Sequence, residues 1–171
     1  MPSSEAHATH CALRPNETDE NFYGWDTIIV TDQDTVDTAL DGCDTVDGNL
    51  MISMYYNGPL TISVTNFSGT ISQSTYYAPS VTNFSMPLAT YIHTIYLENL
   101  PSLENLLLPI VTEMDTLYIS GDGSINVVRG YLENASVVDM QGSAIEYDTV
   151  RTGLAFANAR IQCKLLNAFP S

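Results

Sequence analysis

The chain has 171 residues, of which 44% are hydrophobic, and its 20 acidic residues against 5 basic ones give a net charge of −15. The hydrophobic content excludes an intrinsically disordered chain. The shortage of Lys and Arg argues against a protein that binds nucleic acid or an anionic membrane surface. The acidic excess is typical of a soluble surface, with a metal ion or a basic partner as the alternative explanation.

The first residues of the chain have little periodicity, and we expect residues 1–25 to form an irregular leader. This start lacks the basic flank and the apolar run of a secretory signal peptide. No segment reaches the ~18 consecutive apolar residues of a membrane span. Taken alone, these features indicate a cytosolic protein.

Four tripeptides fit the N-glycosylation acceptor pattern and point to a different compartment. Their asparagines are Asn16, Asn66, Asn83 and Asn134. Together with a single lysine, Lys164, they favour a secreted eukaryotic protein. We therefore expect that a signal peptide is missing from this sequence, through truncation or a misplaced start codon.

Apolar triplets recur from residue 28 onward, and their first residues are 22, 21, 24, 22 and 21 positions apart. A repeat of this length is typical of a β-solenoid, in which a coil buries its apolar face only by stacking on its neighbours. The triplets are Ile28-Ile29-Val30, Leu50-Met51-Ile52, Ile71-Ser72-Gln73, Ile95-Tyr96-Leu97, Leu117-Tyr118-Ile119 and Val138-Asp139-Met140.

A short helix is predicted after the first strand, because Val36, Ala39 and Leu40 keep helical spacing and Gly42 suits a left-handed stop. This helix would cap the open end of the solenoid. A second strand column with the same period comprises 60–62, 84–86 and 106–108, and the prolines that follow two of them mark coil corners. The sequence therefore predicts an all-β parallel β-helix over residues 26–145, with residues 146–171 as a poorly matching tail that could hold a further coil.

Side chains alternate along a strand, so the outer two residues of each triplet point inward and the middle one outward. Only Gln73 breaks the apolar inward set. Aromatic rings with polar tips suit sugars and protein partners alike, which makes Met51, Tyr96 and Tyr118 the candidate ligand-binding residues. The alternative is that the tyrosines pack against each other or under a loop. The full outward column is Ile29, Met51, Ser72, Tyr96, Tyr118 and Asp139.

Three cysteines fit a secreted protein incompletely. Cys11 and Cys43 flank the first triplet, and a bridge between them would tie the leader to the second coil. Cys163 is left over, either as a buried thiol or as half of a bridge to a partner beyond this chain.

The stretch from Cys43 to Ser53 resembles the Cys-x-x-Val/Ile-x-Gly-x-Leu-x-Ile signature that opens receptor L-domains. The Leu-Pro-x-Leu texture of residues 100–109 resembles one branch of that group, the fungal GPI-anchored cell-wall organisation proteins. The resemblance covers residues 26–145. It implies a right-handed, leucine-rich-repeat-like β-helix, a disulfide between Cys11 and Cys43, glycosylation and a cell-surface location. It implies no catalytic residues and no cofactor, and a membrane contact only through a GPI anchor that this sequence does not contain.

Parallel β-helices also include polysaccharide-degrading enzymes, whose chemistry needs two facing carboxylates. Asp115, Asp122 and Asp139 are candidates, but no convergent constellation is evident, and His93 has no obvious partner. We expect these aspartates to be turn or surface residues. No spacing of Cys, His or acidic residues indicates a metal site.

Three functions follow in order of preference. The first is a non-enzymatic, glycosylated cell-surface protein that supports fungal cell-wall organisation through its solenoid face, with wall glycans or surface proteins as partners. The second is a secreted module that recognises a glycan or protein without a role in the wall. The third is a β-helical polysaccharide-degrading enzyme.

Overall fold

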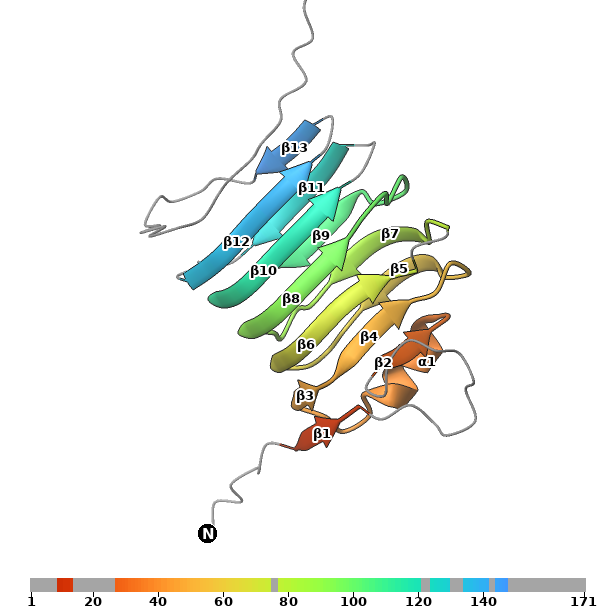
Figure 1. Ribbon diagram of the computed structural model, residues 1–171, viewed down its shortest axis with the longest axis vertical. Helices are drawn as coiled ribbons and strands as arrows, with labels where there is room; N and C mark the ends of the chain where they lie inside the picture. The colour runs from red at the N-terminus through yellow and green to blue at the C-terminus, as the bar shows by residue number, and fades with distance from the viewer. Residues whose placement is uncertain are drawn as a thin grey trace, which may run out of the picture.

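Two parallel sheets built from successive coils form the body of the protein (Figure 1). The computed structural model describes residues 9–13, 27–74, 77–120, 124–129, 134–141 and 144–147. The large sheet has the strand order β1 (His10–Ala12), β3 (Thr45–Asp47), β6 (Asn66–Gln73), β8 (Tyr91–Leu97), β10 (Glu113–Ser120) and β12 (Asn134–Gln141). Two shorter strands complete it, since β2 (Thr27–Val30) pairs with β4 (Asn49–Ile52) and β4 pairs with β6.

The small sheet supplies the return strand of each coil. Its order is β5 (Asn57–Thr61), β7 (Ser80–Ser85), β9 (Asn105–Leu108), β11 (Ser124–Arg129) and β13 (Ala144–Tyr147). Neighbouring strands in both sheets are parallel. The predicted parallel β-solenoid is therefore confirmed, with about four turns, and its last described strand runs past residue 145.

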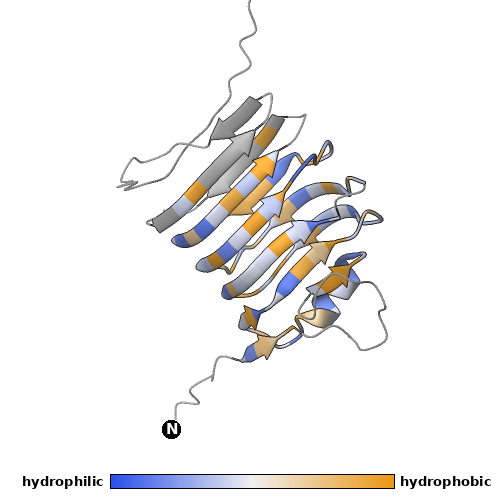
Figure 2. Cartoon of the chain, viewed as in Figure 1, coloured by the Kyte–Doolittle hydropathy of each residue, from blue (hydrophilic) through white to orange (hydrophobic). Residues whose placement is uncertain are grey.

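The core lies between the two sheets and consists of the inward residues of both strand columns. In the large sheet Ile71 pairs with Ile95, and in the small sheet Phe84 pairs with Leu106; all four side chains are fully buried. Burying a side chain of this size contributes about 1.5–3 kcal/mol. Hydrophobic and hydrophilic residues alternate along the strands of the large sheet (Figure 2), as expected for strands with one buried and one outer face.

The predicted capping helix is present as α1 (Gln33–Ala39). Asp32 is its N-cap: the carboxylate accepts hydrogen bonds from the backbone N–H and the hydroxyl of Thr35, and these bonds lower the pKa of Asp32. Val36, on the inner face of the helix, is buried in the core. Gly42, with φ +71°, follows in the left-handed conformation that was predicted to stop it.

The side chain of Gln33 caps the free edge of β5, the first strand of the small sheet. Its Nε2 donates to the carbonyl of Thr61 at 2.7 Å, and its Oε1 accepts from the N–H of the same residue at 2.8 Å. Because β5 is the edge strand, Gln33 satisfies backbone groups that would otherwise pair with another strand. The helix therefore closes both the core and a backbone edge.

The leader contains one strand that the sequence analysis did not predict. β1 pairs with β3, with Cys11 opposite Val46. The disulfide between Cys11 and Cys43, 32 residues apart, holds this strand against the solenoid. A three-residue strand has too little periodicity to detect, and it forms because the bridge and the edge of β3 fix it in place. Cys163 lies outside the described residues.

Two glycines let neighbouring coils approach closely at a bend in the large sheet. The register of β6 on β8 shifts between Phe67 and Thr70. A Cβ atom on Gly69 would lie 1.7 Å from the carbonyl oxygen of Gly48, whose own φ is +128°. The side-chain Oδ1 of Asn49 accepts from the N–H of Thr70 at 2.9 Å. No side chain larger than hydrogen fits at position 69 without moving backbone.

Candidate functional site

The outward column of the large sheet has the order that the sequence predicted. Met51 pairs with Ser72, Ser72 with Tyr96, and Tyr96 with Tyr118. The column begins at Ile29 and continues to Asp139 in β12. A period of about 22 residues therefore places side chains from distant parts of the sequence in one row across the strands.

Tyr96 and Tyr118 form a stacked pair on this outer face. Their ring centroids are 4.6 Å apart and the ring planes differ by 14°. The separation matches the spacing of neighbouring strands, so each ring uses one face to contact the other. Tyr96 is 42% exposed. The predicted alternative, that the tyrosines pack against each other, is thus correct for one face of each ring.

The hydroxyl of Tyr96 is fixed by a neighbouring carboxylate. It donates a hydrogen bond to Glu98 Oε1 at 2.5 Å, and this bond is the main reason that the pKa of Tyr96 is raised to about 12. The hydroxyl therefore stays protonated throughout the physiological pH range. The bond orients the ring of Tyr96 on an otherwise open surface.

Met51 occupies its predicted place in the column but is not an exposed surface residue. It is only 7% exposed and lies outside the main hydrophobic cluster. It lines a groove on the outer face, beside the stacked pair. The alternation along β4 gives the side on which Met51 points, whereas the groove walls around it come from other coils.

The groove has a volume of about 570 Å³. Tyr77, which is 70% exposed, stands on its rim, and Glu98 is its charged residue. Ligand sites in proteins commonly have volumes of ~300–1,000 Å³. The remaining lining residues are mostly polar and uncharged: Thr27, Asn49, Met51, Thr70, Ser72, Gln73, Ser74, Ala78, Tyr96 and Asn99.

Gln73, the residue that breaks the apolar inward set, connects β6 to the turn at the end of β8. Its Nε2 donates to the backbone carbonyl of Glu98. Its Oε1 is buried and, among the described residues, has no hydrogen-bond partner, which is unfavourable for stability. The turn itself includes Asn99 with φ +49°. Gln73 therefore fixes the position of the groove wall that carries Glu98.

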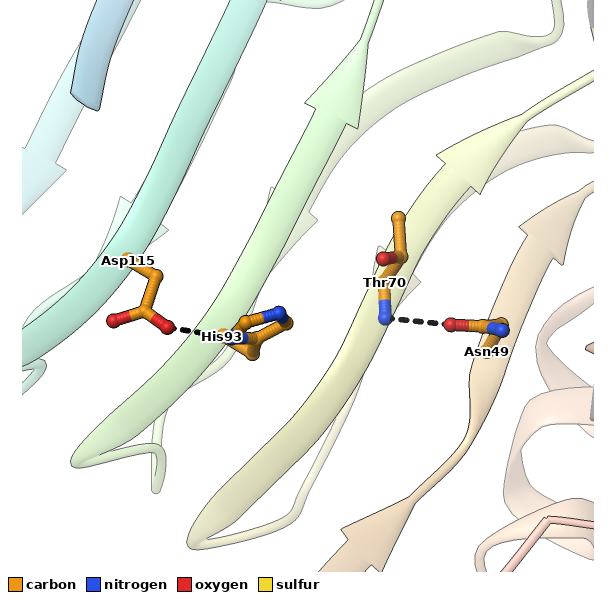
Figure 3. A network of polar contacts seen from close by, with 4 residues as sticks. All are labelled: Asn49, Thr70, His93 and Asp115. Atoms are coloured by element: carbon orange, nitrogen blue, oxygen red, sulfur yellow. Dashed lines mark hydrogen bonds and ion pairs between the residues drawn. The ribbon is translucent and has the colours of Figure 1, made fainter. Parts of the chain in front are cut away.

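His93 and Asp115 form a hydrogen-bonded pair further back along the same strands (Figure 3). His93 Nδ1 lies 2.6 Å from Asp115 Oδ2, and both side chains are about half exposed. No obvious partner for His93 was expected from the sequence, and this expectation is wrong. The separation of 22 residues equals the repeat period and would have identified the pair. Asp122 lies outside the described residues, and only the strand position of Asp139 is described.

The sequons lie away from the stacked tyrosines. Asn66 and Asn134 occupy one column at the start of the strands of the large sheet, because each is in register with a residue of the Tyr91–Glu113 pair. Tyr91 is five residues before Tyr96 in β8, a distance of about 16 Å along a strand. Asn83 lies on the small sheet and accepts from Asn105 Nδ2 at 2.6 Å. Asn16 lies outside the described residues.

Other kinds of site are not evident in the part of the chain that the structure describes. No group of three or more His, Cys, Asp or Glu side chains there could hold a metal ion. No helix among those residues is long and apolar enough to cross a membrane. Comparison of the chain with protein-family models, curated proteins and solved structures gives no match.

Proposed function

We propose that this protein binds a cell-wall glycan through the outer face of its large sheet, and that it acts as a non-enzymatic, glycosylated surface protein in fungal cell-wall organisation. The observation that carries the proposal is the stacked pair of Tyr96 and Tyr118 beside a polar groove. Rigid aromatic rings, one of them with its hydroxyl oriented by Glu98, suit the apolar faces and hydroxyl edges of sugar rings.

The positions of the sequons support this choice of face. Glycans on Asn66 and Asn134 would start at the far end of the strands, and one on Asn83 would extend from the small sheet. The outer face around Tyr96 and Tyr118 would then stay accessible. The disulfide between Cys11 and Cys43 is consistent with an oxidising, extracellular location.

The Cys43–Ser53 signature supports a receptor L-domain and the Leu-Pro texture of residues 100–109 supports its fungal wall branch, with a GPI anchor outside this sequence as the proposed membrane attachment. Its Val46, Leu50 and Ile52 are fully buried, and Gly48 makes the close coil contact. These positions therefore have structural roles at the start of a solenoid. The proposed partners are wall glycans or surface proteins, not nucleic acid.

Binding to insoluble wall polysaccharides tests the proposal. The purified chain should sediment with β-1,3-glucan, chitin or isolated fungal walls, and the double variant Tyr96→Ala/Tyr118→Ala should bind at least ten times more weakly. Tyr55→Ala is the matched control, because Tyr55 is 75% exposed and does not line the groove. Equal binding by wild type and the double variant would refute the proposed face. Release of reducing sugar would refute the non-enzymatic role.

A further inference from the structure

The outward column contains a gap between two large side chains. Ser72 stands between Met51 and Tyr96, in register with both. Neighbouring strands are about 4.8 Å apart, so the residues on either side of Ser72 are separated by about 9.6 Å. The small side chain of Ser72 forms the floor of this gap. We call the space above it the Ser72 slot.

The walls of the Ser72 slot are apolar on both sides. Tyr96 uses one ring face to stack on Tyr118, and its other face is directed toward the neighbouring strand β6, which carries Ser72. Met51 stands opposite and also lines the groove, but it is only 7% exposed, so it closes the base of the second wall. A ring placed between them at van der Waals contact, about 3.5–4 Å from each wall, needs about 7–8 Å. The slot therefore has the width of one ring.

The chemistry around the slot selects against an anionic ligand. Of the residues that line the groove, Glu98 alone is charged, and no lining residue is Lys, Arg or His. A carboxylate or phosphate would meet this acidic group without a cation to pair with, on a protein of net charge −15. Asn49, Thr70 and Ser72 offer amide and hydroxyl groups instead, which suit the hydroxyls of an uncharged sugar.

We propose that the Ser72 slot is a subsite for one pyranose ring of an uncharged polysaccharide, with one ring face on Tyr96 and its lower edge near Ser72 and Met51. This assignment rests on the proposed glycan-binding function. It adds where one sugar ring binds and that the polysaccharide is uncharged. Because the slot lies over β6 and runs along it, the remaining sugars of the chain would continue along the groove, past the end of β6 toward Tyr77 on its rim.

Filling the slot tests the assignment. Ser72→Tyr would extend the tyrosine stack by one ring and occupy the space. Ser80→Tyr is the matched control, because Ser80 is an exposed strand residue on the small sheet. Binding is measured by calorimetry with laminarihexaose and with N-acetylated chitohexaose, both uncharged, and with hexagalacturonate as the anionic probe. We expect at least a tenfold loss of affinity for an uncharged hexasaccharide in Ser72→Tyr, and a change of less than twofold in Ser80→Tyr.

The outcomes separate the slot from the broader proposal. If Ser72→Tyr folds and keeps its affinity, the slot assignment is wrong. If Tyr96→Ala/Tyr118→Ala still loses binding in the same assay, the proposed glycan-binding face remains supported. If Ser72→Tyr does not fold, Ser72→Val decides, because valine suits a strand and narrows the slot; a threefold loss supports the slot and no loss overturns it. Tighter binding of hexagalacturonate than of the uncharged hexasaccharides would overturn the assignment of an uncharged ligand. A wild-type protein that sediments with walls but binds neither uncharged hexasaccharide also overturns the slot.

Discussion

The amino-terminal end of the solenoid and its middle coils are built in different ways. The end depends on contacts that occur once among the described residues: the Cys11–Cys43 disulfide, the Gln33 amide on β5, and the approach of Gly48 to Gly69 of β6. The strands from β6 to β10 repeat the same apolar inward positions, with Gln73 as the exception, and vary mainly on their outer face. Closing a stack of coils requires specific chemistry, whereas a repeated core leaves the outer face free to carry a binding site.

Removing the disulfide should give the largest loss of stability. In Cys11→Ser/Cys43→Ser the constraint on a 32-residue separation is lost, and the chain-entropy relation gives a loss of roughly 3–4 kcal/mol in the free energy of unfolding. Urea unfolding measures it. Because the bridge lies at the end, glycan binding at Tyr96 should be unchanged at temperatures where the variant is folded. A loss below about 1 kcal/mol would mean that the backbone bonds of β1 already hold the leader.

Closing the space between Gly48 and Gly69 should have the next largest effect. In Gly69→Ala the new Cβ would overlap the carbonyl of Gly48, so the two coils must separate at a cost of about 3 kcal/mol. Gly42→Ala is the control: nothing lies within 4 Å of its Cβ position, and only its φ of +71° opposes alanine, which costs about 1–2 kcal/mol. Thermal unfolding should rank the variants in this order. Equal losses would show that the coils at Gly48 and Gly69 can move apart at little cost.

Alkaline pH should weaken the end of the solenoid through Tyr56. Burial raises the pKa of Tyr56 from 10.0 to about 12, and its hydroxyl donates to the carbonyl of Pro59 at 2.8 Å. The folded state therefore keeps a proton that the unfolded chain releases, so this contribution to stability is full below pH 10 and is lost as the pH rises toward 12. Tyr56→Phe should lose about 1 kcal/mol at neutral pH and show a weaker decline between pH 10 and 12. Urea unfolding at stepped pH measures both, and an unchanged decline would assign the effect to other tyrosines.

The sequence predicted the repeated part of this molecule better than the unique part. A fixed period with alternating side chains determines which residues share a column, so the row from Met51 to Tyr118 was predicted correctly. The same pattern does not say what covers a side chain, which is why the low exposure of Met51 was missed. The strand at His10–Ala12 has no period at all. The His93–Asp115 pair follows from the repeat length once a partner is sought one coil away, and the role of Gln73 depends on a turn whose conformation no pattern encodes.

The smallest expected effect concerns the stacked tyrosines, and it tests whether the middle coils tolerate change. A double-mutant cycle with Tyr96→Ala and Tyr118→Ala should give a coupling of about 0.5–1.5 kcal/mol, the usual value for an aromatic pair beyond its buried area. Urea unfolding of the four proteins measures it. Because the rings lie on the outer face, the double variant should remain folded with its core intact. A coupling well above this range would make the pair a structural element of the coil stack. A small coupling together with a large loss of glycan binding would mean that the pair serves the ligand more than the fold.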